Sequence, residues 1–258
     1  MKVSQLAAVA VAILALGACE RDSPSRVRAP GADESGKTEA LEAGADLLQQ
    51  KAPLRALNAY LNGFHFENGD MGSQMEAHHF CGHINQDVIQ CVLFDGNGDS
   101  AKLVGIEYII SATLFASLPA EEKHLWHSHV HEVKSGQLIA PGIPLIAEHE
   151  LMEEIIGTYG KTWHTWHTGK GDALPVGVPA LMVGFTRDGQ LDERLLSERD
   201  ARLEVRSNEI RAQRADIVGP VIDTDADAWE KGIVMQIQPA RQAPSAATPA
   251  EATGRARQ

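Results

Sequence analysis

Residues 88–110 read VIQCVLFDGNGDSAKLVGIEYII. Two runs rich in apolar and β-branched residues, 88–94 and 103–110, lie on either side of the polar segment 95–100 (DGNGDS). Such runs favour strands, and a cluster of Asp, Gly and Asn is typical of the turn between two antiparallel strands. This stretch therefore predicts a β-hairpin. Asp95, Asn97 and Asp99 imitate the start of a calcium loop, but Ser100 and Ile106 stand where such a loop needs Gly and Glu.

The segments around the hairpin predict both helices and strands. Strands are expected around 77–83, 162–168 and 180–185, where apolar and β-branched residues gather. Helices are expected over 38–48, from Pro53 with Leu54, Leu57 and Leu61 on one face, from Pro119, over 147–159, and as a surface helix over 191–210. The order of elements predicts an α+β fold, a single domain with a small, mostly antiparallel sheet flanked by helices.

The two ends of the chain differ from the middle. Residues 1–18 have a basic start, a short apolar run and small residues before Cys19, which together are typical of a signal peptide. Leu-Gly-Ala-Cys fits the lipobox of bacterial lipoproteins, so Cys19 is expected to carry acyl chains and to hold the protein in the bacterial cell envelope, facing the periplasm or the outer surface. Residues 19–37 then form a flexible tether, 38–238 the folded domain and 239–258 a disordered tail.

The charge balance excludes one class of partner. The chain carries 35 acidic against 23 basic residues, a formal net charge of -12. A negative field repels polyanions, so we expect no nucleic-acid binding.

Most of the histidines fall in three short segments, 78–83, 124–132 and 163–167. Side chains at every second position of a strand share a face, so His79, Cys81 and His83 would converge, as would His127, His129 and His131. Imidazole and thiolate are ligands that zinc favours, which makes zinc the candidate cofactor. The other interpretation is a solvated strand face or hydrogen-bonded core histidines, since the metal motif HExxH is absent.

Glu107 stands out because it lies in the apolar run 104–110. A carboxylate buried there without a partner would be costly, so a histidine, a lysine or a metal is expected beside it. Cys81 and Cys91 are compatible with a disulfide and also with two free buried thiols.

Several segments together resemble the oil-body-associated protein family, which is usually catalogued as a domain of unknown function. They are 77–81 (AHHFC), 105–111 (GIEYIIS), 118–122 (LPAEE), 125–129 (LWHSH), 132–136 (EVKSG), 158–161 (TYGK) and 178–182 (VPALM), and the resemblance covers about 38–238. It implies lipid proximity and no established reaction. The matching positions that could do chemistry are His79, Cys81, Glu107, His127, His129, Glu132 and Lys134. The reducing cytosol of the plant members argues against a disulfide on which the fold depends.

Three functions follow as hypotheses. The first is a membrane-anchored lipoprotein that binds a lipid or protein partner at a membrane surface. The second is a zinc enzyme, such as a hydrolase, with a cluster of His79, His127, His129 and Glu132 and with Glu107 as base. The third is a purely structural domain. Cys81 has a candidate thiol role. The sequence predicts that His79, His127 and His129 lie close together, with Glu107 or Glu132 beside them.

Overall fold

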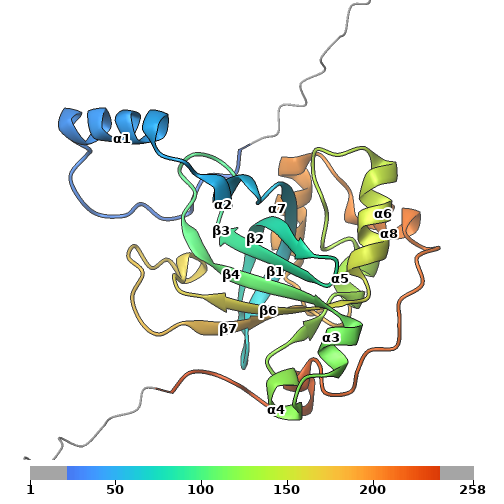
Figure 1. Cartoon of the computed structure of the whole chain (residues 1–258). Coiled ribbons are helices and arrows are strands. Elements are labelled where there is room, and N and C mark those ends of the chain that lie inside the picture. The colour runs from blue at the N-terminus through green and yellow to red at the C-terminus, as the bar shows by residue number, and fades with distance from the viewer. Residues whose placement is uncertain (1–21, 239–258) are drawn as a thin grey trace, which may run out of the picture.

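The computed structural model describes residues 22–238, so the expected signal peptide, Cys19 and the tail 239–258 lie outside the described residues. Its strands form one antiparallel sheet in the order β4-β3-β2-β1-β7-β6, and β4 also pairs with β6 (Figure 1). The strands are β1 (Ala59–Glu67), β2 (Asp70–Asn85), β3 (Val88–Phe94), β4 (Leu103–Ser111), β5 (His127–Ser128), β6 (Thr158–His164) and β7 (Ala180–Val183). The expected small sheet is thus a closed, six-stranded barrel, to which the short β5 adds beside β6.

The predicted hairpin is present as β3 and β4. These strands pair from Val88 with Ile110 to Phe94 with Leu103, with a register shift near Leu93. The second edge of β4 pairs with β6 over its whole length, from Gly105 with His164 to Ser111 with Thr158. This second pairing closes the sheet, because it leaves β4 with no free edge.

The helices lie around the outside of the barrel, with α6 and α8 together on one side and α3 and α4 below the strands in Figure 1. They are α1 (Gly36–Leu48), α2 (Ala52–Arg55), α3 (Ala112–Ala116), α4 (Ala120–Lys123), α5 (Val130–Ser135), α6 (Leu145–Ile155), α7 (Glu193–Leu203) and α8 (Ser207–Gln213), with 3-10 turns η1 (Thr168–Lys170) and η2 (Ala228–Lys231). Within residues 22–238, no helix combines the length and the apolar character needed to cross a membrane.

Three of the expected helices are wrong in extent. The helix expected over 147–159 is α6, which ends at Ile155, and Thr158 and Tyr159 already belong to β6. The helix expected from Pro53 ends at Arg55, and the chain enters β1 four residues later, at Ala59. In β1 the side chains alternate between the barrel interior and the helix-covered outside, so sheet pairing overrides the helical spacing of the leucines. The helix expected over 191–210 is split into α7 and α8 by Glu204, which has a left-handed backbone with φ 55°.

The same helix was expected to lie on the surface, and one of its charged residues is buried instead. The Arg199 side chain on α7 is fully buried, although it is charged. Its guanidinium donates hydrogen bonds to Asn62 Oδ1 and to the backbone oxygens of Gly136 and Gln137, each at 2.9–3.0 Å. A buried cation keeps its charge only with such partners, so α7 is anchored to β1 and to the segment after α5.

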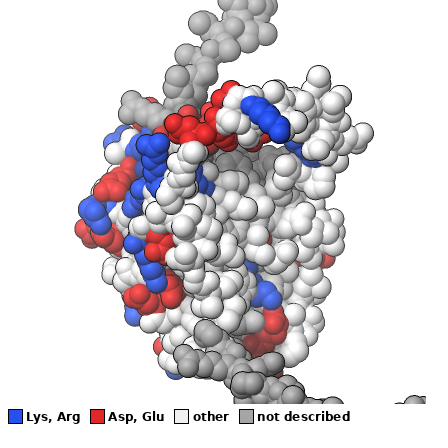
Figure 2. All heavy atoms as spheres, turned by 90° about the vertical axis from the view of Figure 1, so that its left-hand side faces the viewer, with Lys and Arg blue, Asp and Glu red and all other residues white. Residues whose placement is uncertain are grey.

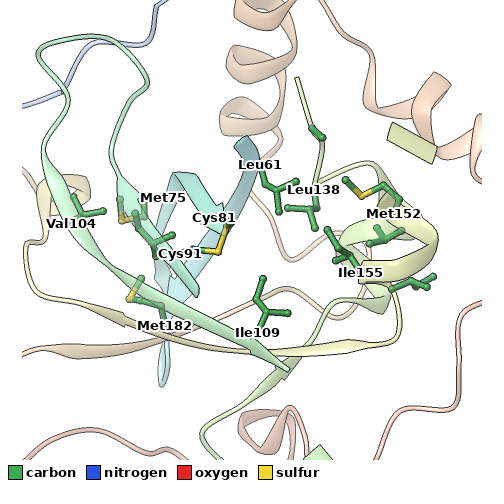
Figure 3. Packing of buried hydrophobic residues seen from close by; sticks show 14 of the residues in the cluster. Leu61, Met75, Cys81, Cys91, Val104, Ile109, Leu138, Met152, Ile155 and Met182 are labelled. Atoms are coloured by element: carbon green, nitrogen blue, oxygen red, sulfur yellow. A yellow bond between two sulfur atoms is a disulfide. The ribbon is translucent and has the colours of Figure 1, made fainter. Parts of the chain in front are cut away.

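The largest apolar core occupies one part of the barrel interior and the adjoining helix α6 (Figure 3). Inward-facing residues such as Leu61, Met75 and Ile109 meet there, and Met152 and Ile155 of α6 pack against the same cluster. A second cluster, built on Phe64, Phe66 and Phe185, lies between the outside of the barrel and α7.

The segment expected to be a free tether makes contacts over part of its length. Ser23 is buried, and its backbone N–H donates to Asn97 Oδ1 at 2.6 Å. The Ser25 hydroxyl donates to Asp95 Oδ2 at 2.7 Å. The turn of the predicted hairpin is therefore a docking point for the start of the described chain, whereas α1 has no buried residue.

Cys81 and Cys91 form a disulfide between directly opposite positions of β2 and β3, visible in Figure 3. Of the two states that the sequence left open, a disulfide and two free buried thiols, the structure has the disulfide. Cys81 therefore has a free thiol, as its predicted role requires, only when this bond is reduced. The two residues face the apolar core, where adjacent strands place their sulfur atoms side by side.

Reduction of this disulfide should lower the free energy of unfolding. A closed loop of about ten residues restricts the unfolded chain by about 2–3 kcal/mol in the chain-entropy model. We expect a decrease of that size in the denaturant unfolding of the reduced protein and of the double variant Cys81→Ala, Cys91→Ala, compared with the oxidised protein. Equal midpoints for the oxidised and reduced proteins would contradict this role.

Candidate functional site

Glu107 lies at the centre of a buried polar cluster inside the barrel. It occupies the middle of β4, where Ile106 and Tyr108 point outward and are partly exposed while Glu107 is 2% exposed. The alternation of a strand thus turns this single carboxylate of β4 inward. An ionised carboxylate in such a place requires compensating partners.

Four imidazoles surround this carboxylate. Its Oε2 atom lies 2.9 Å from Nε2 of His79 and 4.0 Å from Nε2 of His65. Its Oε1 atom lies 3.4 Å from Nε2 of His127 and 3.5 Å from Nε2 of His129. His79 and His127 were predicted from the sequence to lie near each other, and they contact the same carboxyl group.

The partners come from two parts of the chain. His65 and His79 point inward from β1 and β2, which pair with each other. His127 belongs to β5, His129 precedes the first turn of α5, and Glu132 lies within that turn. The Glu132 Oε2 atom lies 3.9 Å from Nε2 of His127. The segment 127–132 thus brings a second carboxylate to the cluster.

His127, His129 and His131 were expected on one strand, but only His127 lies on it. The strand ends at Ser128, and α5 begins at Val130. The His131 ring consequently points away, 3.9 Å from Asp188 and 3.3 Å from the Gln137 amide nitrogen. His129 reaches the cluster and also contacts the Thr158 hydroxyl through Nδ1 at 2.8 Å.

Glycines leave the room that the cluster occupies. A Cβ atom at Gly160 would lie 2.1 Å from Glu107 Oε1 and 2.8 Å from His127 Cε1. A Cβ atom at Gly184 would lie 2.8 Å from Glu132 Oε2. Contacts this short do not occur in proteins, so the absence of side chains at these two positions is a condition for the cluster.

Burial determines the protonation of most of these groups. It lowers the pKa of His127 and His164 to about 3 and the pKa of His65 well below its ordinary value, so all three rings are neutral. Burial also raises the pKa of Glu107, but the imidazoles of His129 and His79 outweigh this effect and hold it well below the usual range. Burial and the neighbouring Glu107 raise the pKa of Glu132 well above the usual range.

Many polar atoms of the cluster lack a hydrogen-bond partner among residues 22–238. They are Glu107 Oε1, Glu132 Oε2, Nδ1 of His65 and His79, and both ring nitrogens of His127 and His164. Buried polar atoms without partners are rare in native proteins, and each one needs an explanation. Here the unpartnered atoms lie in one place, and all of them are imidazole nitrogens or carboxylate oxygens, which are atoms that bind metal ions.

Two histidines of this interior were not among the sequence-predicted site residues. His65 lies in a segment expected to follow a helix, and only the alternation of Leu61, Gly63 and His65 along β1 could have revealed its inward position. His164 belongs to the third histidine segment, 163–167, but not to the residues predicted to form the site. Its ring is fully buried, 5.7 Å from the His65 ring between centroids.

Other candidates lie elsewhere. His83 is exposed near the end of β2. Lys134 donates to the backbone oxygens of Arg214 and Ile217, both at 2.7 Å, so it fixes the chain after α8. The acidic pair Asp95 and Asp99 belongs to the hairpin turn.

Comparisons with known proteins agree on one family. The family described as "Protein of unknown function (DUF1264)" matches residues 51–218. Oil body-associated protein 1A of Zea mays is 44% identical over 218 residues, covering 84% of this chain and 92% of that protein. Oil body-associated protein 1B of Arabidopsis thaliana is 39% identical, covering 81% and 88%. No solved structure matches the chain.

These relatives correct the expected location. They are plant proteins whose names associate them with oil bodies, which overturns the expectation of a bacterial cell envelope. The family match includes β1 to β7 and therefore every residue of the cluster around Glu107. The chain belongs to the family of oil body-associated proteins, which shares the domain of unknown function DUF1264.

Proposed function

We propose that the domain binds a divalent transition metal inside the barrel, at Glu107, His127, His129 and Glu132. The observation that supports this proposal is a group of buried carboxylate and imidazole atoms without a hydrogen-bond partner among residues 22–238. Ligand atoms of His127, His129 and Glu132 all lie within 4.8 Å of one another, as do those of His65, Glu107 and His127, so His127 is common to both groups. An ion would give these atoms the partner they lack, and its charge would balance the buried carboxylate.

The separations within this set suit a shared ion. Two donors bound to one ion at about 2.0–2.1 Å in tetrahedral geometry lie about 3.3–3.4 Å apart. His127 Nε2 lies 3.4 Å from Glu107 Oε1 and 3.9 Å from Glu132 Oε2, and His129 Nε2 lies 3.5 Å from Glu107 Oε1. Imidazole nitrogen with carboxylate oxygen suits zinc and also iron.

A plain hydrogen-bonded network explains less. In such a network Glu107 would accept from His79 at 2.9 Å, but Glu107 Oε1 and both nitrogens of His127 would remain unpartnered. Leaving a buried donor or acceptor without a partner costs about 1–3 kcal/mol for each group. A metal removes several of these costs at once.

The geometry supports binding more directly than hydrolysis. The residues of the proposed set are at most 3% exposed, so a substrate would need a route through the barrel wall or past α5. A zinc-bound water could act as a nucleophile only if such a route opened and one of the four side chains left the ion, because four protein ligands fill a tetrahedral zinc. The hydrolase hypothesis therefore depends on a motion, whereas metal binding depends only on side chains already in place.

Metal binding should be detected as a gain in stability. A ligand present at 100 times its dissociation constant stabilises the native state by about 2.7 kcal/mol. We expect Zn²⁺ to raise the melting temperature of chelator-treated protein. Glu107→Gln removes the central charge, so it should raise the Zn²⁺ concentration needed for the same increase at least tenfold. Glu121→Gln, on the surface of α4, is the matched control. An unchanged melting temperature with Zn²⁺, and no metal retained after dialysis, would contradict the proposal.

A second candidate function, contact with a neutral lipid surface, is favoured by a different observation. Helix α1 stands off the barrel (Figure 1) and exposes Leu41, Leu47 and Leu48, which are 64%, 84% and 81% exposed. On the outside of β4, Leu103, Ile106 and Tyr108 are exposed as well. Figure 2, which looks at the side of Figure 1 where α1 stands, shows a broad area without charged side chains.

An exposed apolar surface of this kind marks an interaction site. The surface and the acidic chain offer little attraction to anionic headgroups, so an uncharged lipid surface fits better than an anionic one. The names of the relatives, oil body-associated proteins, agree with such a partner. Acylation of Cys19 lies outside the described residues and stays a prediction.

Polar substitution of α1 should release the protein from lipid. Burial of a leucine contributes about 1.5–3 kcal/mol, so Leu41→Gln with Leu48→Gln should weaken binding to a phosphatidylcholine-coated triolein emulsion at least tenfold. Flotation measures the bound fraction. Val221→Gln is the control, because Val221 is 97% exposed and does not belong to α1 or β4. Equal flotation of the double variant and the wild-type protein would exclude α1 as the contact.

A further inference from the structure

The two oxygens of Glu107 face two different groups of histidines. Oε1 faces His127 and His129, at 3.4 and 3.5 Å, on the side of the segment 127–132. Oε2 faces His79 and His65, at 2.9 and 4.0 Å, on the side of β1 and β2. A single tetrahedral ion accepts four donors, and the proposed set of Glu107, His127, His129 and Glu132 already fills it.

We propose that the barrel holds a dinuclear metal centre in which Glu107 bridges two ions, one on each oxygen. This inference rests on the proposed function, because the first ion is the one bound by the set that includes His129 and Glu132. The second ion takes Glu107 Oε2 together with His79 and His65. The centre is of the kind in which two divalent ions lie about 3.5–4 Å apart.

The second group offers donors of the right type. His65 and His79 project from paired strands, and their rings are 5.0 Å apart between centroids in an edge-on arrangement. The two rings do not stack, and Nδ1 of each has no hydrogen-bond partner among residues 22–238. His164 lies next to His65 and has both nitrogens unpartnered, so a third imidazole is available on this side.

The burial of this second group also requires an explanation. His65 and His164 are 1% and 0% exposed, and neither belongs to the set proposed for the first ion. A barrel interior is normally filled by apolar side chains, as it is here around Leu61, Met75 and Ile109. Three buried imidazoles on this side of the barrel interior cost folding energy unless a ligand pairs with them.

The bridging position gives Glu107 a different role from the one expected from the sequence. A general base must have an oxygen free to accept a proton from water or substrate. With one ion on each oxygen, Glu107 is a ligand on both sides and not a base. Among the imidazoles of the cluster, the Glu132 carboxylate contacts that of His127 alone, so Glu132 lies at the edge of the centre.

The number of ions per chain tests this inference directly. The full chain is treated with a chelator, loaded with Zn²⁺, dialysed and analysed for zinc by elemental analysis. We expect two ions per chain for the wild-type protein and one for His65→Ala with His79→Ala. His83→Ala, an exposed histidine on β2, is the matched control and should retain two.

The possible results separate this inference from the proposed function. No bound zinc would overturn both. One ion per chain that is lost in His129→Ala and kept in the variant lacking His65 and His79 would overturn the dinuclear centre and leave the first site standing. X-ray absorption at the zinc edge needs no variant. A zinc–zinc distance of about 3.5–4 Å would support the bridge, and two ions without that distance would contradict it.

Discussion

The pairing of β4 with β6 is the constraint on which the site depends. The hairpin of β3 and β4 alone would be an open sheet edge, with Glu107 at the border of the sheet. Pairing along the whole of β4 closes the barrel and surrounds Glu107 by strands on both sides. The same pairing places Gly160 of β6 beside the carboxylate, where a larger residue would collide with it. Closure therefore creates both the dry interior and the need for partners inside it.

Two buried arginines hold in place the chain around the segment 127–132, which forms one side of the site. The segment 127–132 carries His127, His129 and Glu132, yet its strand has only two residues. Arg199 donates to the backbone oxygens of Gly136 and Gln137, and the fully buried Arg214 donates to those of Val133 and Leu138. Positive charge at the last carbonyls of a helix is favourable, and these bonds fix α5 against the barrel. The position of Glu132 follows from that anchoring.

The two candidate functions use different sides of the protein: the metal centre lies in the buried interior, and the proposed lipid contact lies on the surface. The cluster around Glu107 lies within residues 51–218, the part that matches the family. Helix α1, from Gly36 to Leu48, lies before that part. The metal centre is thus a proposal about the part that matches the family model, whereas the proposed lipid contact combines α1, which lies before that part, with β4, which lies within it. The disulfide between Cys81 and Cys91 lies within the shared domain but between two strands of its apolar core.

What the sequence determined by itself was local. The hairpin over 88–110 followed from a turn between two β-favouring runs, and the expectation that Glu107 needs a partner followed from its apolar neighbours. The closure of the barrel was not predictable, because pairing between β4 and β6 joins residues about fifty positions apart, and no local pattern records it. His65 was missed for the same reason, since its inward position depends on β1 pairing with β2 and β7. Only the tertiary structure showed that one carboxylate has a separate pair of histidines at each oxygen, because that arrangement combines four strands and a helix turn that are distant in the chain.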